Sequence, residues 1–193
     1  MGLLLKFSGI IDGINRRVGT WFALLVLVAV LVSSGNAIVR KIFDLSSNAW
    51  LELQWVLFSA VFLLCAPWTL LSNEHVRIDI VNGMLPGRVR SAIDLIGHVF
   101  FLLPLTIIMI VTSIPFFLRS IRLNEQSFSS GGLPQWPAKS LIVIGFTLLA
   151  AQCISEIVKR IAVMRGVIPD PYMERRSVLE AEVAQAVEAV EKR

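Results

Sequence analysis

The sequence is poor in charged residues and nearly lacks the side chains that build metal or catalytic sites. Of 193 residues, 17% are charged, two are histidines and two are cysteines, whereas 55% are hydrophobic. The cysteines show no metal-ligand spacing and no disulfide framework. The apolar residues gather in stretches too long for helices of a soluble protein. The composition therefore indicates an integral membrane protein.

Four apolar stretches are long enough to cross a bilayer, whose hydrocarbon core takes about 20 residues of helix. They predict membrane-spanning helices over roughly residues 20–39, 50–71, 93–118 and 140–162. A β-barrel is excluded, because its strands are short and alternate in polarity, whereas residues 100–114 are almost unbroken apolar sequence. A cleavable signal peptide is disfavoured, because the first stretch exceeds the usual signal core of about 7–15 residues.

Basic residues are unevenly distributed between the two predicted sides of the membrane. Thirteen of the 18 lysines and arginines lie on the side of both termini, and five lie on the other side. Since cytoplasmic segments carry the excess of basic residues, both termini are predicted to be cytoplasmic. The segment of residues 124–140 then faces outward.

Both ends of the chain have helical patterns of their own. Apolar residues at helical spacing in residues 1–17 predict an amphipathic helix along the inner membrane interface, with a disordered tail as the alternative. Glycine and proline in residues 166–171 end the fourth span, and residues 166–193 predict a cytoplasmic helical tail. The fold class is thus all-α integral membrane, divided into residues 1–17, a four-helix membrane domain over 18–165 and a tail over 166–193.

Ionisable residues are rare within the predicted spans. Ion carriers place such residues at membrane depth, but residues 140–155 hold no charge and His98 alone titrates in residues 95–118. Glu156 comes late in the last span and can pair near the inner boundary. His75 and His98 are not placed as facing haem ligands. The spans therefore predict a scaffold with no catalytic residue, cofactor or metal. Pro104 within a span predicts a bend, and Gly145 predicts a close helix contact.

Two polar passages flank the second span. In "NAWLELQWVLF", Glu52 and Trp55 suit a membrane interface, and Glu52 is expected to pair with Arg40 or Lys41. In "NEHVRIDIV" and the residues after it, apolar residues at helical spacing predict a segment that lies along the membrane surface, called the strap below. Its polar side chains would hold it in place by charge-assisted hydrogen bonds or by reaching the lipid headgroups. The candidate subunit-interface or structural residues are Glu52, Trp55, His75, Arg77, Asp79, Arg88 and Glu156.

The third polar passage is "NEQSFSSGGLPQWPAKS", residues 124–140. It is longer than the usual connection between helices, and long loops tend to be functional or disordered. Its glycines and Pro134 favour tight turns, and Pro137 suits the first turn of the fourth helix. The candidate docking residues in this loop are Glu125, Ser127, Gly131, Gly132, Trp136 and Lys139.

Taken in order, "NAWLELQWVLF", "NEHVRIDIV", "EQSFSSGGLPQWPAKS" and "LLAAQCISEIVKR" resemble a known family. They look like the small permease subunit, or Q subunit, of tripartite ATP-independent periplasmic (TRAP) transporters, over about residues 10–165. The residues that carry most of the resemblance are His75, Val76, Arg77 and Asp79, together with residues 131–137. They resemble in particular the branch labelled mannitol or chloroaromatic-compound type.

The resemblance implies a division of labour among three proteins. A periplasmic binding protein captures an organic acid, and a large permease subunit moves the acid with a coupling ion, usually sodium, in an elevator-like manner. The small subunit would be a static scaffold in the bacterial inner membrane that holds no substrate, with residues 124–140 contacting either the binding protein or the large subunit. One alternative function is a stand-alone oligomeric channel or exporter, which needs a polar stripe across the spans. Another is a membrane anchor for an enzyme complex, which needs a cofactor ligand or a soluble partner.

Overall fold

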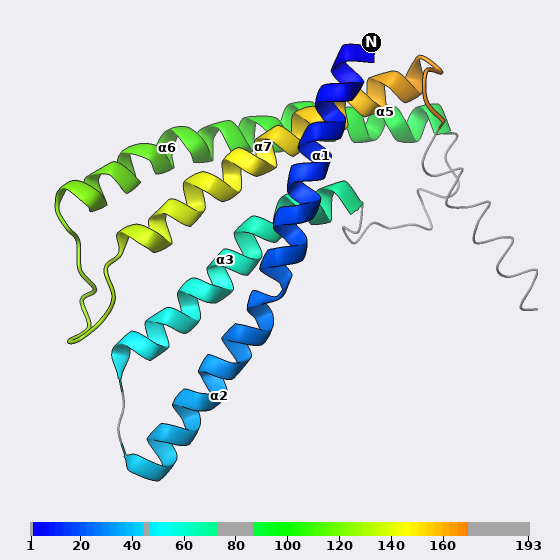
Figure 1. Ribbon diagram of the computed structural model, residues 1–193. Helices are drawn as coiled ribbons and strands as arrows, with labels where there is room; N and C mark the ends of the chain where they lie inside the picture. The colour runs from blue at the N-terminus through cyan, green and yellow to red at the C-terminus, as the bar shows by residue number, and fades with distance from the viewer. Residues whose placement is uncertain (1, 45–46, 73–86, 170–193) are drawn as a thin grey trace, which may run out of the picture.

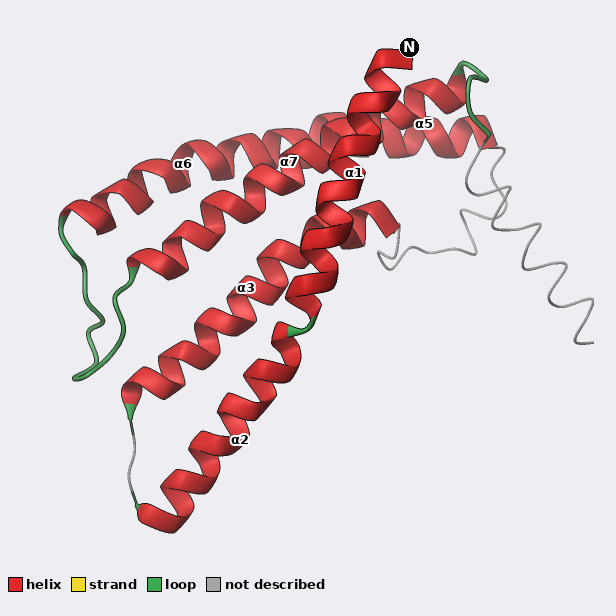
Figure 2. Cartoon of the chain, in the orientation of Figure 1, coloured by secondary structure: helices red, strands yellow, loops and turns green. Residues whose placement is uncertain are grey.

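The computed structural model describes residues 2–44, 47–72 and 87–169, and in these residues all regular structure is helical apart from one isolated bridge between Gln126 and Pro134 (Figures 1 and 2). The elements are α1 (Gly2–Ala23), α2 (Leu25–Phe43), α3 (Asn48–Ser72), α5 (Gly87–Gly97), the π-helix η1 (His98–Leu102), α6 (Leu103–Arg122) and α7 (Trp136–Met164). Four helical stretches are long and apolar enough to cross a membrane: Gly2–Phe43, Asn48–Ser72, Val89–Arg122 and Trp136–Met164. The predicted all-helical fold with four spanning helices is therefore confirmed.

Helices α1 and α2 form one long run that is interrupted only at Leu24, where the Leu24 N–H bonds the Trp21 carbonyl at 3.3 Å. The run has 42 residues, which at the α-helical rise is about 63 Å, roughly twice the thickness of a bilayer core. The predicted first span, residues 20–39, lies within this run. Part of the run must therefore extend beyond the hydrocarbon core of the membrane. The interfacial position of residues 1–17 stays a prediction.

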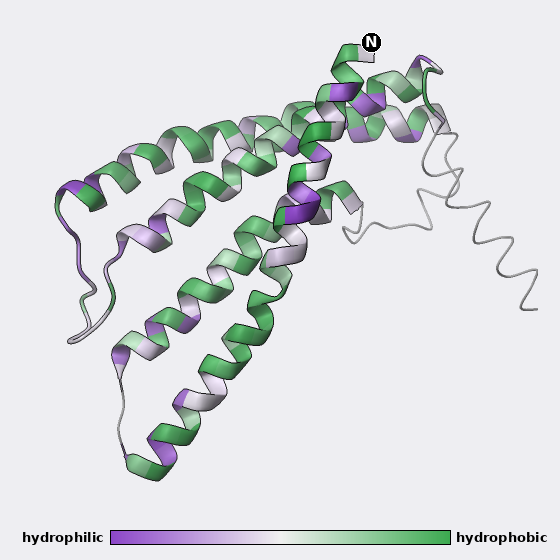
Figure 3. Cartoon of the chain, viewed as in Figure 1, coloured by the Kyte–Doolittle hydropathy of each residue, from purple (hydrophilic) through white to green (hydrophobic). Residues whose placement is uncertain are grey.

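Helix α1 crosses over α3 and α7 (Figure 1). Its buried residues, which recur at helical spacing, are Ser8, Ile11, Asn15 and Gly19. Gly19 lies against Trp68 of α3 so closely that a Cβ atom would be 2.6 Å from the Trp68 side chain. Large apolar residues of α1, among them Phe7 and Ile10, face outward. The polar positions of α1 stand out among mainly hydrophobic helices in Figure 3.

Helix α7 is the centre of the bundle, packing against α1, α3, α5 and α6. The predicted close contact at Gly145 is present, because a Cβ there would lie 2.9 Å from the backbone oxygen of Leu63. The absence of a side chain at this position lets α3 and α7 pack backbone to backbone.

Pro104 is the second residue of α6, which follows the π-helical turn η1. The Leu103 N–H bonds the carbonyl oxygen of His98, five residues earlier, instead of the usual fourth. A proline cannot donate a backbone hydrogen bond and its ring crowds the preceding turn. The wider turn accommodates that loss, so the backbone adjustment expected around Pro104 takes the form of a π-bulge.

Helix α2 is the least covered element. Ala29 is its only buried residue, and it packs mainly on α3. A hydrogen bond of 3.0 Å from the Gln54 side-chain nitrogen of α3 to the Ser33 hydroxyl ties the two helices together. Most of the α2 surface is apolar and exposed, as expected for a helix that contacts lipid or another membrane protein.

Candidate functional site

Two groups of interacting polar side chains stand out among the described residues. At one end of the bundle, the connection between α6 and α7 folds back as a hairpin, residues 125–135. The Ser127 N–H bonds the Leu133 carbonyl at 3.2 Å, and the Gln135 N–H bonds the Glu125 carbonyl at 3.0 Å. The hairpin and the groups that fasten it to α3 and α7 are called the hairpin clasp below.

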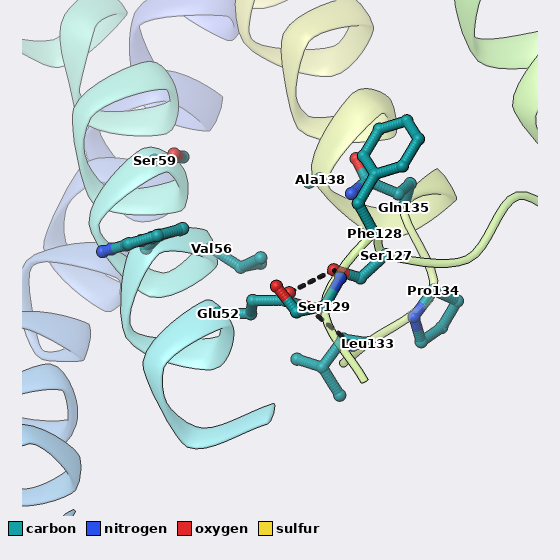
Figure 4. A pocket seen from close by; sticks show the side chains of 11 residues that line it. Glu52, Val56, Ser59, Ser127, Phe128, Ser129, Leu133, Pro134, Gln135 and Ala138 are labelled. Carbon is teal, nitrogen blue, oxygen red and sulfur yellow. Dashed lines mark hydrogen bonds between the residues drawn. The ribbon is translucent and has the colours of Figure 1, made fainter. Parts of the chain in front are cut away.

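Glu52 of α3 is the main fastening of the hairpin clasp (Figure 4). Its carboxylate accepts one hydrogen bond from the Ser127 hydroxyl and another, of 2.7 Å, from the Leu133 N–H. Asn48, one turn earlier on α3, donates its side-chain amide to the Ser130 carbonyl at 3.0 Å. Charge-assisted bonds to a carboxylate are among the stronger hydrogen bonds in proteins. The hairpin is therefore held in one position by the first two turns of α3.

The two glycines of the hairpin have different physical roles. Gly131 has φ of +72°, a left-handed conformation that side chains disfavour. Gly132 has no positive φ, but a Cβ there would lie 2.5 Å from the Ser127 Cβ and 2.7 Å from each carboxylate oxygen of Glu52. The first glycine forms the turn, as the sequence predicts. The second leaves room for the Glu52 carboxylate to reach the backbone.

A second fastening joins the start of the hairpin to α7. Lys139 forms an ion pair with Glu125, and its ammonium group lies 4.0 Å from the centre of the Phe116 ring of α6. The hydrogen bond from Lys139 holds the pKa of Glu125 below its usual value. Lys139 is buried, so the ion pair and the aromatic ring together satisfy its charge.

Two aromatic residues of the loop remain outside these contacts. Phe128 is 99% exposed, and Trp136 at the start of α7 is also exposed. Phe128 is one of the residues that line a cavity of about 310 Å³, together with Glu52 and Ser127 (Figure 4). In the clasp, the side chains of Glu125, Ser127 and Lys139 bond other groups of the chain, whereas the Phe128 ring is exposed.

The other polar group lies where α1 crosses α7, and it is called the α1–α7 polar cluster below. Its members are Ser8, Asp12 and Asn15 of α1 and Gln152, Ser155, Glu156 and Lys159 of α7.

Gln152 is the fully buried hub of this cluster. Its side-chain oxygen accepts a 2.7 Å bond from the Asn15 amide, and its nitrogen donates 3.0 Å bonds to both Asp12 and Glu156. Lys159 pairs with the same two carboxylates, at 3.0 Å for Asp12. A buried polar group is costly unless it is paired, and each of these side chains has at least one partner. The buried side-chain oxygen of Asn15 has no hydrogen-bond partner among the described residues.

Two serines close the cluster. The Ser155 hydroxyl donates to Asp12 at 2.8 Å, and the Ser155 and Ser8 oxygens lie 2.6 Å apart. Close by on α7, Arg160 pairs with Asp94 of α5 at 3.3 Å, both side chains being less than 10% exposed. Polar bonds therefore hold both α1 and α5 to the same stretch of α7.

The structure places the sequence-predicted residues unevenly. Glu125, Ser127, Gly132 and Lys139 come together in the hairpin clasp, joined by Glu52. Trp55 lines the cavity beside the clasp and is exposed. Glu156 lies at the opposite end, in the α1–α7 polar cluster. The expected pairing of Glu52 with Arg40 or Lys41 is wrong, because the hairpin takes both carboxylate oxygens.

The predicted strap, with His75, Arg77 and Asp79, lies outside the described residues, as does most of the tail. The main chain of Arg88 lies in the first turn of α5.

Sequence reasoning missed Asp12, Asn15, Gln152 and Ser155 as a group. A signal was present, since Ser8, Asp12 and Asn15 are spaced four and three residues apart, which places them on one face of a helix. Gln152, Glu156 and Lys159 have the same spacing on α7. Two matching polar stripes on helices that are otherwise apolar indicate a contact between them.

The comparison with protein families decides what kind of protein has this arrangement. Residues 29–163 match the family described as tripartite ATP-independent periplasmic transporters, DctQ component. The chain belongs to this family. The resemblance noted in the sequence is therefore confirmed for the family as a whole, and the chain is a multi-pass membrane subunit of a TRAP transporter. Neither the curated proteins nor the solved structures contain a match to it.

The matched range of this DctQ component covers one of the two polar groups fully and the other in part. It contains the whole hairpin clasp and the α7 half of the α1–α7 polar cluster, whereas the α1 half precedes residue 29. The family match therefore does not extend to Ser8, Asp12 and Asn15 of α1.

Proposed function

We propose that this DctQ component is a static scaffold for the large permease subunit of a TRAP-type secondary transporter. The transporter takes up an organic acid that a periplasmic binding protein delivers, and an ion gradient, usually of sodium, drives the uptake. The large subunit holds the substrate and ion sites and moves in an elevator-like manner. The chain lies in the inner membrane with both termini in the cytoplasm, and it belongs to the mannitol or chloroaromatic branch.

One observation carries the scaffold role: the charged side chains of α3, α6 and α7 lie towards the ends of these helices. Residues 53–72 of α3, 103–118 of α6 and 140–155 of α7 contain no Asp, Glu, Lys, Arg or His. Carriers that move ions through their own core generally place such residues at mid-membrane depth. This distribution favours a scaffold over the stand-alone channel or exporter.

The pairing of the charges supports the same role. Lys139 pairs with Glu125, Lys159 with Asp12 and Glu156, and Arg160 with Asp94. These pairs join one helix or loop to another and so help to fix their positions. The exposed apolar faces of α2 and α6 are suited to lipid and to the large subunit.

Co-purification tests this proposal directly. Tagged chain extracted from native membranes in mild detergent should carry a much larger polytopic membrane protein at a fixed ratio. The same chain reconstituted alone should give no organic-acid flux above empty liposomes. Robust flux from the chain alone would refute the scaffold role and support the channel.

We further propose that the hairpin clasp is part of the platform for the binding protein. Glu125, Ser127 and Lys139 bond other groups of the chain, whereas the aromatic side chains of Phe128 and Trp136 are exposed and can contact a partner. An exposed aromatic anchor on a fixed loop suits weak and reversible docking. The alternative partner of this surface is the large subunit.

A single substitution separates these two partners. Phe128→Ser should lower uptake that depends on the binding protein while the large subunit still co-purifies. Val167→Ser, at an exposed apolar residue that follows α7 at its other end, is the control and should leave uptake unchanged. Loss of the large subunit in Phe128→Ser would assign the hairpin to that subunit instead.

A further inference from the structure

The cavity beside the hairpin clasp combines one negative charge with exposed aromatic side chains. Among the described residues that line it, Glu52 alone is ionisable, and Trp55 and Phe128 are both exposed (Figure 4). Its volume of about 310 Å³ lies at the lower end of the range of about 300–1,000 Å³ for small-molecule sites. The cavity therefore suits one side chain or a small group of atoms.

No cation among the described residues balances the charge of Glu52. Its hydrogen bonds come from the neutral Ser127 hydroxyl and the neutral Leu133 N–H, and none of the ion pairs of the described residues includes it. The other carboxylate of the clasp, Glu125, pairs with Lys139. Hydrogen bonds donated to a carboxylate favour its ionised form. Glu52 is thus a fixed anion in the wall of the cavity.

The Glu52 carboxylate has acceptor capacity left for a further donor. An ionised carboxylate offers about four acceptor positions on its two oxygens. Ser127 and Leu133 each use one position, on different oxygens, and the Ser129 hydroxyl uses at most one more. At least one position therefore remains. Because Glu52 lines the cavity, a donor that enters the cavity can reach this position.

A guanidinium group is complementary to this combination of groups. It is a permanent cation with several N–H donors, it is weakly hydrated, and it stacks on aromatic rings. A lysine ammonium is more strongly hydrated and so loses more on leaving water. An inorganic cation would use the carboxylate but gain nothing specific from an indole ring. Trp55 is the aromatic residue of the cavity whose ring type gives the strongest cation–π attraction.

We propose that the cavity receives an arginine side chain of the periplasmic binding protein, which pairs with Glu52 and lies against Trp55. This proposal rests on the role of the hairpin clasp as a platform for that protein. Arginine and aromatic residues are enriched among the residues that dominate binding energy at protein interfaces. A charge pair at a docking surface also orients the partner and speeds its association. The arginine would therefore set the position of the binding protein on the platform, beside the contact at Phe128.

Biolayer interferometry on the complex of this chain with the large subunit, held in nanodiscs, tests the proposal. Purified binding protein is the analyte, and each of its exposed arginines is changed to glutamine in turn. One of these changes should weaken binding about tenfold, the loss expected for a charge-assisted hydrogen bond with an aromatic contact. Trp55→Leu should weaken binding of the wild-type binding protein by a similar factor, and so should Glu52→Gln. The sensitive arginine variant should lose little more against either of them, because both partners of one contact are then absent.

Trp55→Leu keeps the test valid if Glu52→Gln loosens the hairpin. Trp55 makes none of the hydrogen bonds of the clasp, so hydrogen–deuterium exchange of residues 125–135 should stay as in the wild type. Two variants are matched controls that should bind like the wild type. Asp44→Asn removes an exposed carboxylate at the end of α2, and Trp50→Leu changes an exposed tryptophan of α3 that does not line the cavity.

Three results would overturn the proposal, and they differ in what they leave standing. If no arginine variant loses its effect against Trp55→Leu, the cavity holds no arginine, but weaker docking of Phe128→Ser would still support the platform. If Phe128→Ser, Trp55→Leu and Glu52→Gln all dock like the wild type, the platform role fails as well. Loss of the large subunit from Trp55→Leu would assign the cavity to that subunit.

Discussion

The hairpin clasp and the α1–α7 polar cluster hold the chain together in different ways. In the clasp, one carboxylate binds a backbone amide and a hydroxyl of a nearby loop. In the cluster, side chains bind side chains across 137 to 147 residues of sequence. The clasp therefore sets the conformation of a loop, whereas the cluster sets the position of a whole helix.

The difference also concerns charge. The second fastening of the clasp joins one cation to one carboxylate at the bundle end. In the cluster, Lys159 is shared by Asp12 and Glu156, and Gln152 bonds both carboxylates as well. Removing the shared cation leaves two poorly solvated carboxylates together. The cluster should therefore be the more sensitive of the two to a single substitution.

Lys159→Met should have the largest effect on stability. The loss of a cation from two partly buried carboxylates should cost about 3 kcal/mol, which corresponds to a fall in melting temperature of roughly 8 °C. Thermal unfolding of the detergent-solubilised chain measures it. Lys159→Met combined with Glu156→Gln should recover about half of the loss, because Asp12 keeps its bonds from Ser155 and Gln152.

The matched control for this prediction is Lys41→Met, at an exposed lysine that ends α2. It should leave the melting temperature unchanged. If Lys159→Met melts like the wild type, the cluster does not hold α1 to α7 as described.

Gly132→Ala should have an intermediate effect that is confined to the hairpin. The added methyl group would overlap the Glu52 carboxylate and displace the loop, with a loss of about 2 kcal/mol of local stability from two hydrogen bonds. Hydrogen–deuterium exchange of residues 125–135 should speed up, while exchange in α7 stays the same. Gly35→Ala, at a position with open space, is the control. Unchanged exchange in Gly132→Ala would show that Glu52 is not the fastening.

Acid should loosen the clasp by the smallest amount. Lys139 lowers the pKa of Glu125 in the folded chain, so the pair stabilises the hairpin above the ordinary glutamate pKa of about 4.3. That stabilisation is lost as the pH falls through the lowered pKa. Exchange of residues 125–135, corrected for its intrinsic pH dependence, should be constant from pH 7 to about pH 5 and rise only in stronger acid. A rise between pH 7 and pH 5 would contradict the ion pair.

The sequence predicts the clasp better than it predicts the cluster, for a physical reason. Turn-forming residues and the fixed φ of proline act over a few residues, so the hairpin and the start of α7 at Trp136 follow from local sequence. Glu52 is recognisable as unusual, because a carboxylate near the end of a span needs a partner. Its actual partner is not recognisable, because loop and helix meet only after folding.

The cluster depends on which helices pack together, which local pattern does not determine. Asp12 and Asn15 suit the water-facing side of an amphipathic helix equally well, and only the crossing of α1 over α7 makes them buried partners. The four spans follow from apolar length alone, whereas the crossing follows from contacts such as Gly19 against Trp68. Where lipid can solvate any apolar face, hydrophobic pattern specifies spans but not neighbours.

A cross-link between α1 and α7 tests the static scaffold most directly. The Ser8 and Ser155 oxygens are 2.6 Å apart, so Ser8→Cys with Ser155→Cys should form a disulfide in a background with Cys65→Ala and Cys153→Ala. Uptake is measured in proteoliposomes that contain the large subunit and the binding protein. The scaffold role predicts the same uptake with the disulfide formed as after its reduction. Uptake that is lost on oxidation and restored by reductant would show that α1 and α7 move during transport, and would contradict the account.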